Sequence, residues 1–276
     1  MKISLEQIYP TLGDIEKNLS KIVDRIDNGI KNKIDLIIFP ELSLTGYSME
    51  EMVFDIAMED LPEILLEKSK KIDIVIGTAE LGSEEYPYNS AFYLSQGKIV
   101  HKHRKVYLPN YGIFTEGRYF MEGDSFAAFD TRFGRMGLLV CEDAWHQSAS
   151  YLLAQDGAKC IINICNSPAR LTGEKETLSE NWKILTKASS ISNGVYNIVV
   201  NRVGVEDGIT FWGNSFVVSP FGKIDIQGEY FQEESIFYDL NKNSVKKARF
   251  SSPSFKNEKI DIVIDTLKWV KLKKKV

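Results

Sequence analysis

Cysteine and histidine are scarce in this sequence, which has three of each among 276 residues. Three thiols cannot all pair, so a disulfide framework is excluded as the basis of the fold. Cys160 and Cys165 lie five positions apart on an apparent strand, and His101 and His103 have no cysteine close to them in the sequence. Structural zinc sites space their ligands differently. We therefore expect no metal, and we predict that Cys160 and Cys165 are core residues.

Long apolar runs and a surplus of positive charge are also missing. No run approaches the roughly 18–20 apolar residues that a membrane-spanning helix needs, and the N-terminal segment MKISLE has an early acid where a signal peptide is apolar. The net charge is −4, from 34 Lys and Arg against 38 Asp and Glu. The chain as a whole lacks the basic footprint of a duplex-binding protein. We therefore expect a cytoplasmic protein that binds neither membranes nor nucleic acids.

The C-terminal residues 268–276 are an exception to this charge balance, since they include five lysines. A short basic run of this kind is typical of a solvated tail. The alternative is that the run contacts a polyanion or a membrane surface.

Strand and helix patterns alternate over the first third of the chain. Residues 3–8 predict a short strand. Asp14 stands at the N-cap of a helix in which apolar residues recur at helical spacing over 15–30. Residues 36–39 form an apolar run ended by Pro40, as expected for a strand buried on both faces. The other elements predicted in this part are a helix over 51–70 and a buried strand over 72–77.

The rest of the chain combines a hairpin with further buried strands. Residues 91–101 predict two strands joined by a turn, and the aromatic segment 107–120 is long and irregular, which is typical of a functional loop. The remaining predicted strands cover 136–141, 161–164, 197–203, 216–218 and, as the last central strand, 236–238; predicted helices cover 148–157 and 177–193. No linker or repeat divides the chain, so we predict one domain over 1–276, with 251–276 as a C-terminal extension.

Three of the predicted elements lead into a reactive side chain: Glu41, Lys105 or Cys141. Because ligands bind beyond the carboxyl ends of strands in α/β sheets, these side chains can converge on one site. A thiol reacts as its thiolate. Glu41 can take the thiol proton and Lys105 can stabilise the thiolate and a developing oxyanion, so the three suit acyl transfer. Taken singly, they are more typical of a solvated acid, a surface lysine and a buried structural thiol.

The segments around these residues resemble the nitrilase superfamily of carbon–nitrogen hydrolases. Similarity to its glutamate, lysine and cysteine motifs lies in residues 36–47 (LIIFPELSLTGY), 104–109 (RKVYLP) and 137–143 (GLLVCED). The order fits, as does the spacing of 64 positions from Glu41 to Lys105 and 36 from Lys105 to Cys141. Further similar segments lie at 201–204, 211–215 and 219–222. The resemblance covers about residues 1–240, and several motifs in order are far more specific than any one of them.

Two segments resemble one particular group within this superfamily. Residues 108–120 (LPNYGIFTEGRYF) and 141–145 (CEDAW) are similar to the glutaminase domains of glutamine-dependent NAD synthetases. By that similarity Glu116 is a second glutamate that helps to position the catalytic groups. The alternative is that Glu116 forms a structural ion pair with Arg118 or Arg104. The residues that we assign to substrate binding on this basis are Tyr111, Glu142, Trp145, Ser167 and Arg170.

The resemblance implies an α/β protein folded as a four-layer α-β-β-α sandwich, assembled as a homodimer or larger even homo-oligomer. It implies that a small-molecule amide is hydrolysed through a Cys141 thioester. Glu41 would be the base, Lys105 and the backbone N–H of Glu142 would bind the oxyanion, and no cofactor would be needed. The sequence has no Ser-Gly-Gly nucleotide loop. We therefore expect a free-standing, glutaminase-like amidase, whose ammonia passes to solvent or to a separate ammonia-using enzyme. A nitrilase acting on a C≡N group and a catalytically silent binding protein of the same fold are the alternatives.

Overall fold

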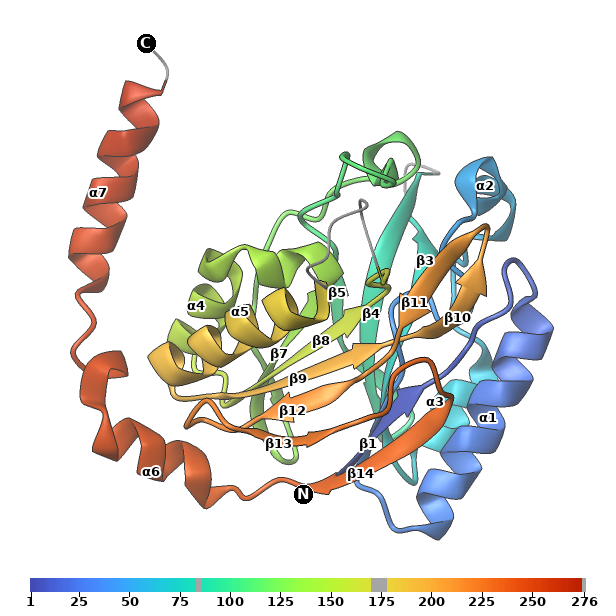
Figure 1. The fold of residues 1–276 in the computed structure, drawn as a ribbon, viewed down its shortest axis with the longest axis horizontal. Coiled ribbons are helices and arrows are strands. Elements are labelled where there is room, and N and C mark those ends of the chain that lie inside the picture. Colours follow the sequence, from blue (N-terminus) through green and yellow to red (C-terminus); the bar gives the residue numbers. More distant parts are fainter. Residues whose placement is uncertain (83–85, 170–177, 275–276) are drawn as a thin grey trace.

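The computed structural model describes residues 1–82, 86–169 and 178–274, whose strands form two six-stranded sheets and a two-stranded hairpin (Figure 1). The first sheet, in the order β14-β1-β2-β3-β4-β5, contains β1 (Lys2–Gln7), β2 (Leu36–Ile38), β3 (Asp73–Leu81), β4 (Pro87–Ser95), β5 (Lys98–Arg104) and β14 (Glu234–Asp239). The second, in the order β13-β12-β9-β8-β7-β6, contains β6 (Phe129–Thr131), β7 (Gly134–Val140), β8 (Cys160–Cys165), β9 (Tyr196–Asn201), β12 (Phe216–Val218) and β13 (Ile224–Gln227). The hairpin pairs β10 (Val203–Glu206) with β11 (Ile209–Trp212).

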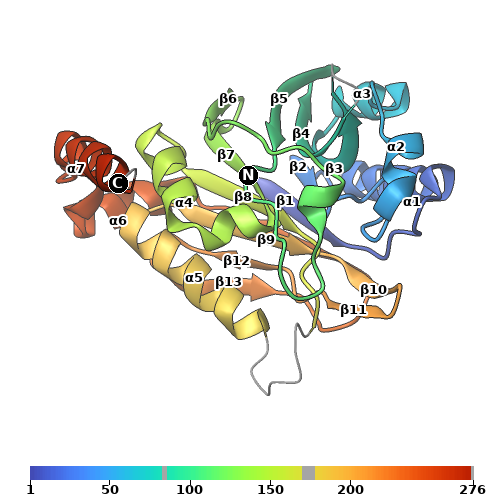
Figure 2. The same ribbon diagram turned by 90° about the horizontal axis from the view of Figure 1, so that it is seen from above.

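The two sheets pack against each other through one apolar cluster, which joins Leu36 and Val75 of the first sheet to Val140 and Ile162 of the second. Helices cover the outer faces (Figure 2). The first sheet is covered by α1 (Ile15–Lys31) and α3 (Glu63–Ser69), whose apolar residues share a second cluster with β2 and β3. The second sheet is covered by α4 (Gln147–Gln155) and α5 (Leu178–Asn193). The predicted four-layer α-β-β-α sandwich is therefore confirmed.

The C-terminal segment leaves this sandwich. After α6 (Asn243–Ser251) and the 3-10 turn η4 (Pro253–Phe255), the last helix, α7 (Ile260–Lys273), extends away from the sheets and buries none of its residues (Figure 1). The other short elements are η1 (Glu50–Met52), α2 (Val53–Ile56), η2 (Glu116–Arg118) and η3 (Cys141–Trp145). Among the described helices, none has both the length and the apolarity that crossing a bilayer requires.

The parallel strands fix where the loops that follow them meet. β1, β2 and β3 run parallel in the first sheet, and β7, β8 and β9 run parallel in the second. The continuous apolar sequence of β2 (LII) fits a strand that is covered on both faces. At the start of the first helix, the predicted cap is confirmed, because the Asp14 side chain accepts a hydrogen bond of 3.0 Å from the Lys17 N–H. The loops after β2, β7 and β8 consequently emerge at the carboxyl ends of parallel strands, where sites form in α/β sheets.

Two predicted elements were wrong in extent or place. The helix expected over 51–70 is broken into η1, α2 and α3, because Ala57 is extended and Met58 pairs as an isolated bridge with Glu80. Pro62 then stands at the start of α3, and the residue before a proline disfavours helical backbone. The strand around 236–238 is not central: β14 pairs with β1 at one edge of the first sheet, and its exposed Phe237 alternates with buried Ile236.

Gly77 of β3 lies directly beneath the turn that carries Glu41. A Cβ atom at this position would lie 2.6 Å from the Leu42 nitrogen and 2.9 Å from the Glu41 Cα atom. The Gly77 carbonyl also accepts hydrogen bonds from the Ser43 hydroxyl and the Leu44 N–H. The turn therefore rests on a strand position where only glycine leaves enough space.

We expect Gly77→Ala to lower the free energy of unfolding by about 1–3 kcal/mol, because the methyl group has to displace backbone atoms. Urea denaturation of the purified variant measures this change. Gly29→Ala in α1 is the matched control, since the nearest atom there is the mobile Cδ1 of Ile72 at 3.1 Å. Equal midpoints for the two variants would contradict the role given to Gly77.

Candidate active site

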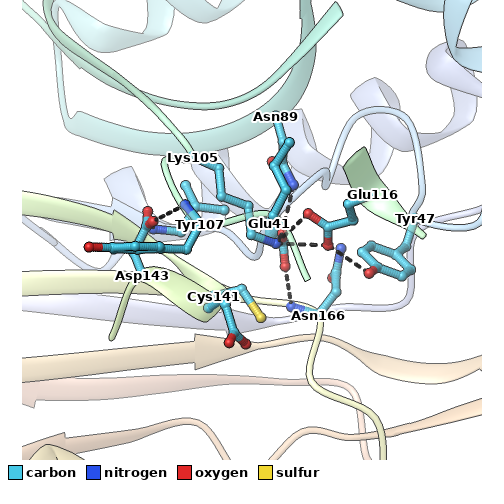
Figure 3. A network of polar contacts seen from close by, with 12 residues as sticks. Glu41, Tyr47, Asn89, Lys105, Tyr107, Glu116, Cys141, Asp143 and Asn166 are labelled. Atoms are coloured by element: carbon cyan, nitrogen blue, oxygen red, sulfur yellow. Dashed lines mark hydrogen bonds and ion pairs between the residues drawn. The ribbon is translucent and has the colours of Figure 1, made fainter. Parts of the chain in front are cut away.

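Glu41 is a fully buried carboxylate at the carboxyl end of the second strand. It follows β2 by three positions, and its side chain has no exposed surface. Its Oε1 atom accepts hydrogen bonds from Asn89 Nδ2 at 2.7 Å and from Lys105 Nζ at 2.9 Å. Its Oε2 atom accepts one from the backbone N–H of Asn166 at 2.6 Å (Figure 3). A buried carboxylate is tolerated only with such partners, and these hold both of its oxygens in fixed directions.

Lys105 is the cation of the same cluster. It comes directly after β5, it is fully buried, and its ammonium lies 2.9 Å from Glu41 Oε1 and 2.7 Å from Glu116 Oε2. Burial alone would lower the pKa of Lys105, but the carboxylates of Glu116 and Glu41 outweigh burial and raise this pKa well above its usual value. Lys105 therefore stays charged between two acids.

Glu116 is the second acid of the cluster, in η2. Its Oε1 atom accepts hydrogen bonds from Lys105 at 2.8 Å and from the Tyr47 hydroxyl at 2.7 Å. The two arginines considered as alternative partners of Glu116 form ion pairs with other acids: Arg104 with Glu80 and Arg118 with Glu51. The structural ion pair considered for Glu116 was therefore wrong, and the residue contacts the predicted catalytic lysine.

The electrostatics of Glu116 set it apart from ordinary surface acids. Burial raises the pKa of Glu116 to about 7. The charge of Lys105 lowers this pKa in part, and the carboxylate of Glu41 raises it. The same surroundings, with burial first and then the Glu116 and Glu41 charges, raise the pKa of Tyr47 well above its usual value. Tyr47 is therefore a neutral donor, and Glu116 exchanges its proton near neutral pH.

Cys141 begins η3, directly after β7, and its sulfur points into the cluster (Figure 3). Its φ of +46° lies in the left-handed region, which non-glycine residues rarely adopt, so the chain turns sharply at the predicted nucleophile. A hydrogen bond with the Cys165 thiol, burial and the Glu41 charge raise the pKa of Cys141 well above its usual value, and Lys105 offsets them only in part. A raised pKa favours the thiol as the resting form of Cys141, so a base has to take this proton before the sulfur can attack.

Cys165 lies beside Cys141 because of the strand register. Val140 of β7 pairs with Ile164 of β8, so the two cysteines follow those partners on adjacent parallel strands. Both belong to the cluster between the sheets, as does Cys160. Cys165 was predicted to be a core residue only; it is buried as expected, and it also lies next to Cys141 on the neighbouring strand.

Asp143 fastens the cysteine turn to the lysine loop. Its Oδ1 atom accepts the N–H groups of Val106 and Tyr107, both at 3.0 Å. Its Oδ2 atom accepts the Val140 N–H at 3.1 Å and lies 2.8 Å from Nε2 of buried His103. One fully buried carboxylate therefore holds the backbone on both sides of the reactive pair, just after Lys105 and just before Cys141.

The residues assigned to substrate binding lie outside this innermost cluster. The exposed Tyr111 donates its hydroxyl to Glu142 Oε2 at 2.8 Å, and Glu142 directly follows the nucleophile. Trp145 packs edge-on against Trp182. Ser167 is buried, and its hydroxyl accepts both the Trp182 and Trp212 indole N–H groups, at 2.9 and 3.1 Å. Arg170 lies outside the described residues.

The structure adds residues that the sequence interpretation missed. Asn89, Tyr47, Asn166 and Asp143 each touch a catalytic candidate or its backbone. Asp143 lies inside the quoted segment 137–143, so its place in that segment was an available signal. Tyr47 also lies in a quoted motif, whereas Asn89 reaches Glu41 from β4 and no local pattern indicates that contact. Within the described part of the chain, no group of three or more acids, histidines or cysteines is arranged to hold a metal ion.

Comparison with known proteins matches the sequence of this chain to one enzyme family. The family model for carbon-nitrogen hydrolases matches residues 2–250. A glutamine-dependent NAD(+) synthetase of Acinetobacter baylyi is 30% identical over 256 residues, covering 89% of this chain and 46% of that protein. An (R)-stereoselective amidase of a Pseudomonas species is 30% identical over 233 residues, covering 81% of this chain and 79% of that protein. The chain thus spans about half the length of this NAD(+) synthetase and most of the length of the amidase.

The fold has close structural counterparts. The crystal structure of a carbon-nitrogen hydrolase from Helicobacter pylori superposes with a TM-score of 0.88 at 24% identity, covering 97% of this chain and 98% of that one. At this identity the likeness shows the shared fold and not a shared substrate.

We expect Asp143→Asn to lower the free energy of unfolding by about 1–3 kcal/mol, because the amide nitrogen cannot accept and leaves at least one buried N–H unpaired. Chemical denaturation measures the change. Asp130→Asn is the matched control, since the Asp130 side chain is 81% exposed and pairs with Arg135 at the surface. A midpoint for Asp143→Asn equal to that of the control would show that Asp143 does not fasten the two loops.

We expect a carboxyl group that titrates near pH 7, because burial raises the pKa of Glu116 to about 7. Carbon-13 NMR of protein labelled at the glutamate carboxyl measures this titration, and Glu116→Gln assigns the signal by removing it. The prediction is wrong if every glutamate signal titrates near the usual value of about 4.3.

Proposed function

We propose that this chain, which belongs to the carbon–nitrogen hydrolase family, hydrolyses the carboxamide of a small molecule and releases ammonia by way of a thioester on Cys141. The observation that carries the proposal is the buried cluster in which Lys105 joins Glu41 to Glu116 beside the thiol. A cation held between acids next to a nucleophile suits acyl transfer, since it can meet negative charge that develops on a carbonyl oxygen.

The first half of the reaction forms the thioester. Glu41 takes the proton of the Cys141 thiol as the sulfur attacks the carbonyl carbon, so that the thiolate appears only when it is needed. The resulting oxyanion accepts hydrogen bonds from Lys105 and from the backbone N–H of Glu142 in the first turn of η3, where helix N–H groups lack partners within the helix. The carbon–nitrogen bond then breaks, Glu41 returns the proton to the nitrogen, and ammonia leaves.

The second half returns the enzyme to its resting form. Glu41 takes a proton from water, and the hydroxyl attacks the thioester carbon. The carbon–sulfur bond breaks, the carboxylic acid leaves, and Cys141 recovers its proton from Glu41. Glu116 accepts a hydrogen bond from Lys105, and Tyr47 donates one to Glu116, so their part is to hold the ammonium in place.

The finer proposal is that the substrate carries an ammonium group as well as an amide, as glutamine does. Glu142 presents a carboxylate just beyond the nucleophile, and the Tyr111 hydroxyl fixes one of its oxygens. The other oxygen lies 3.9 Å from His146 Nε2 at the exposed side of the site. A carboxylate in this position can pair with a cationic substrate group. The similarity of the chain to a glutamine-dependent NAD(+) synthetase supports this choice.

The decisive measurement is ammonia release from a panel of amides and nitriles that includes glutamine, its des-amino analogue and simple aliphatic members. We expect amides to react and glutamine to exceed its des-amino analogue, because only glutamine offers an ammonium to Glu142. We expect Cys141→Ala to abolish turnover, since it removes the nucleophile. Cys160→Ala is the matched control and should retain activity, because Cys160 lies at the opposite end of β8 from the loop that holds Glu41.

Each result of the panel decides a different part of the proposal. Ammonia release from glutamine that is lost in Cys141→Ala supports both the thioester mechanism and a substrate that carries an ammonium group. Ammonia release from a nitrile alone is consistent with Cys141 as the nucleophile but overturns the proposal that the substrate is an amide. Turnover that persists in purified Cys141→Ala overturns the mechanism, and no turnover together with an unreactive Cys141 favours a catalytically silent binding protein.

A further inference from the structure

Asn166 has a buried carboxamide that nothing in the mechanism above uses. It directly follows β8, its side chain is 1% exposed, and its backbone N–H donates to Glu41 Oε2 at 2.6 Å. Neither its Nδ2 nor its Oδ1 atom has a hydrogen-bond partner among the described residues. In Figure 3 its side chain extends from the strand end toward the side of the cluster where Glu116 and Tyr47 lie.

Leaving such a group unpaired is unfavourable. Each buried polar atom without a partner costs about 1–3 kcal/mol, and buried polar groups in folded proteins are almost always hydrogen-bonded. Asn89, the other amide beside Glu41, likewise has an Oδ1 atom without a partner, although its Nδ2 donates to the carboxylate. Two amides with free polar atoms therefore flank the proposed base, as expected where a polar ligand completes the hydrogen bonding.

The chemistry of the free group indicates what it would bind. A carboxamide presents one acceptor and two donor hydrogens in a plane, and another carboxamide is its natural complement. An ester or a nitrile has no N–H to give to the Asn166 oxygen. Because the Asn166 backbone N–H is bonded to Glu41 Oε2, a group bound by the Asn166 side chain lies beside the carboxylate that returns the proton to the leaving nitrogen.

We propose that Asn166 determines the substrate class by accepting an N–H of the scissile carboxamide at its Oδ1 atom. The inference rests on the proposed function and sharpens it, since it makes the site selective for primary amides over esters and nitriles of the same acyl group. Holding the NH2 group also turns the nitrogen toward the proton on Glu41, so the contact assists departure of ammonia. A site built to bond a substrate N–H rejects an analogue that lacks it because the buried acceptor is then left unpaired.

The test compares an amide with the methyl ester of the same acyl group, using the amide that the wild-type protein hydrolyses best. Both substrates give the same Cys141 thioester, so the ratio of their kcat/KM values reports only the acylation step. We expect Asn166→Leu, which keeps the shape and removes both polar atoms, to lower kcat/KM for the amide about 100-fold. Its kcat/KM for the ester should stay within about threefold of wild type, because the ester never made the hydrogen bond.

Two controls keep the comparison interpretable. Asn197→Leu removes another buried asparagine side chain, one that bonds Ser190 and Ser189 away from the cluster, and should leave the ratio of amide to ester unchanged. Alkylation of Cys141 by iodoacetamide checks that each variant keeps its nucleophile. If Asn166→Leu does not fold, Asn166→Ala removes the same polar atoms with less bulk and should show the same selective loss.

The outcomes separate this inference from the proposed function. A selective loss on the amide supports the role of Asn166. An equal loss on amide and ester, or no loss on either, overturns it and leaves amide hydrolysis in place. If the wild-type protein hydrolyses esters or nitriles but no amide, the proposed function fails and the role of Asn166 fails with it.

Discussion

The buried ammonium of Lys105 is the constraint on which the site depends. Taking a charged lysine out of water costs several kcal/mol, and the cost is recovered only if opposite charges meet it at close range with good geometry. Here two acids do so, Glu41 from the loop after β2 and Glu116 from η2. Three segments far apart in the sequence are therefore forced to converge, and the place where they converge is the place where the proposed chemistry occurs.

The nucleophile reaches this cluster from the other sheet. Glu41 and Lys105 follow strands of the first sheet, whereas Cys141 follows β7 of the second. The reactive groups therefore meet only because the sheets pack face to face, and Asp143 fastens the joint by accepting backbone N–H groups from both sides. The polar cluster therefore depends on the apolar core between the sheets, since a shift of either sheet would separate the thiol from its partners.

The sequence indicated the groups that end apolar strands, but only part of what surrounds them. Glu41 and Cys141 were candidates because each follows an apolar strand and such ends gather at one edge of a sheet, and the family resemblance then singled them out together with Lys105 and Glu116. The contact of Asn89 with Glu41 could not, because it depends on how β4 pairs with β3 and on which face its side chains take. The same limit explains β14: an apolar triplet predicts a strand, but its place at the edge is decided by its single partner, β1.

The cluster also explains why an acid and not the lysine is the proposed base. Its acids raise the pKa of Lys105, so the ammonium keeps its protons throughout. Its surroundings raise the pKa of Cys141, so the sulfur keeps its proton until attack. When that proton moves to Glu41, the carboxylate loses its charge at the moment when the substrate oxygen gains one. Lys105, which at rest bonds Glu41, can then turn to the new oxyanion, so the same cation stabilises the negative charge before and after it moves from Glu41 to the substrate.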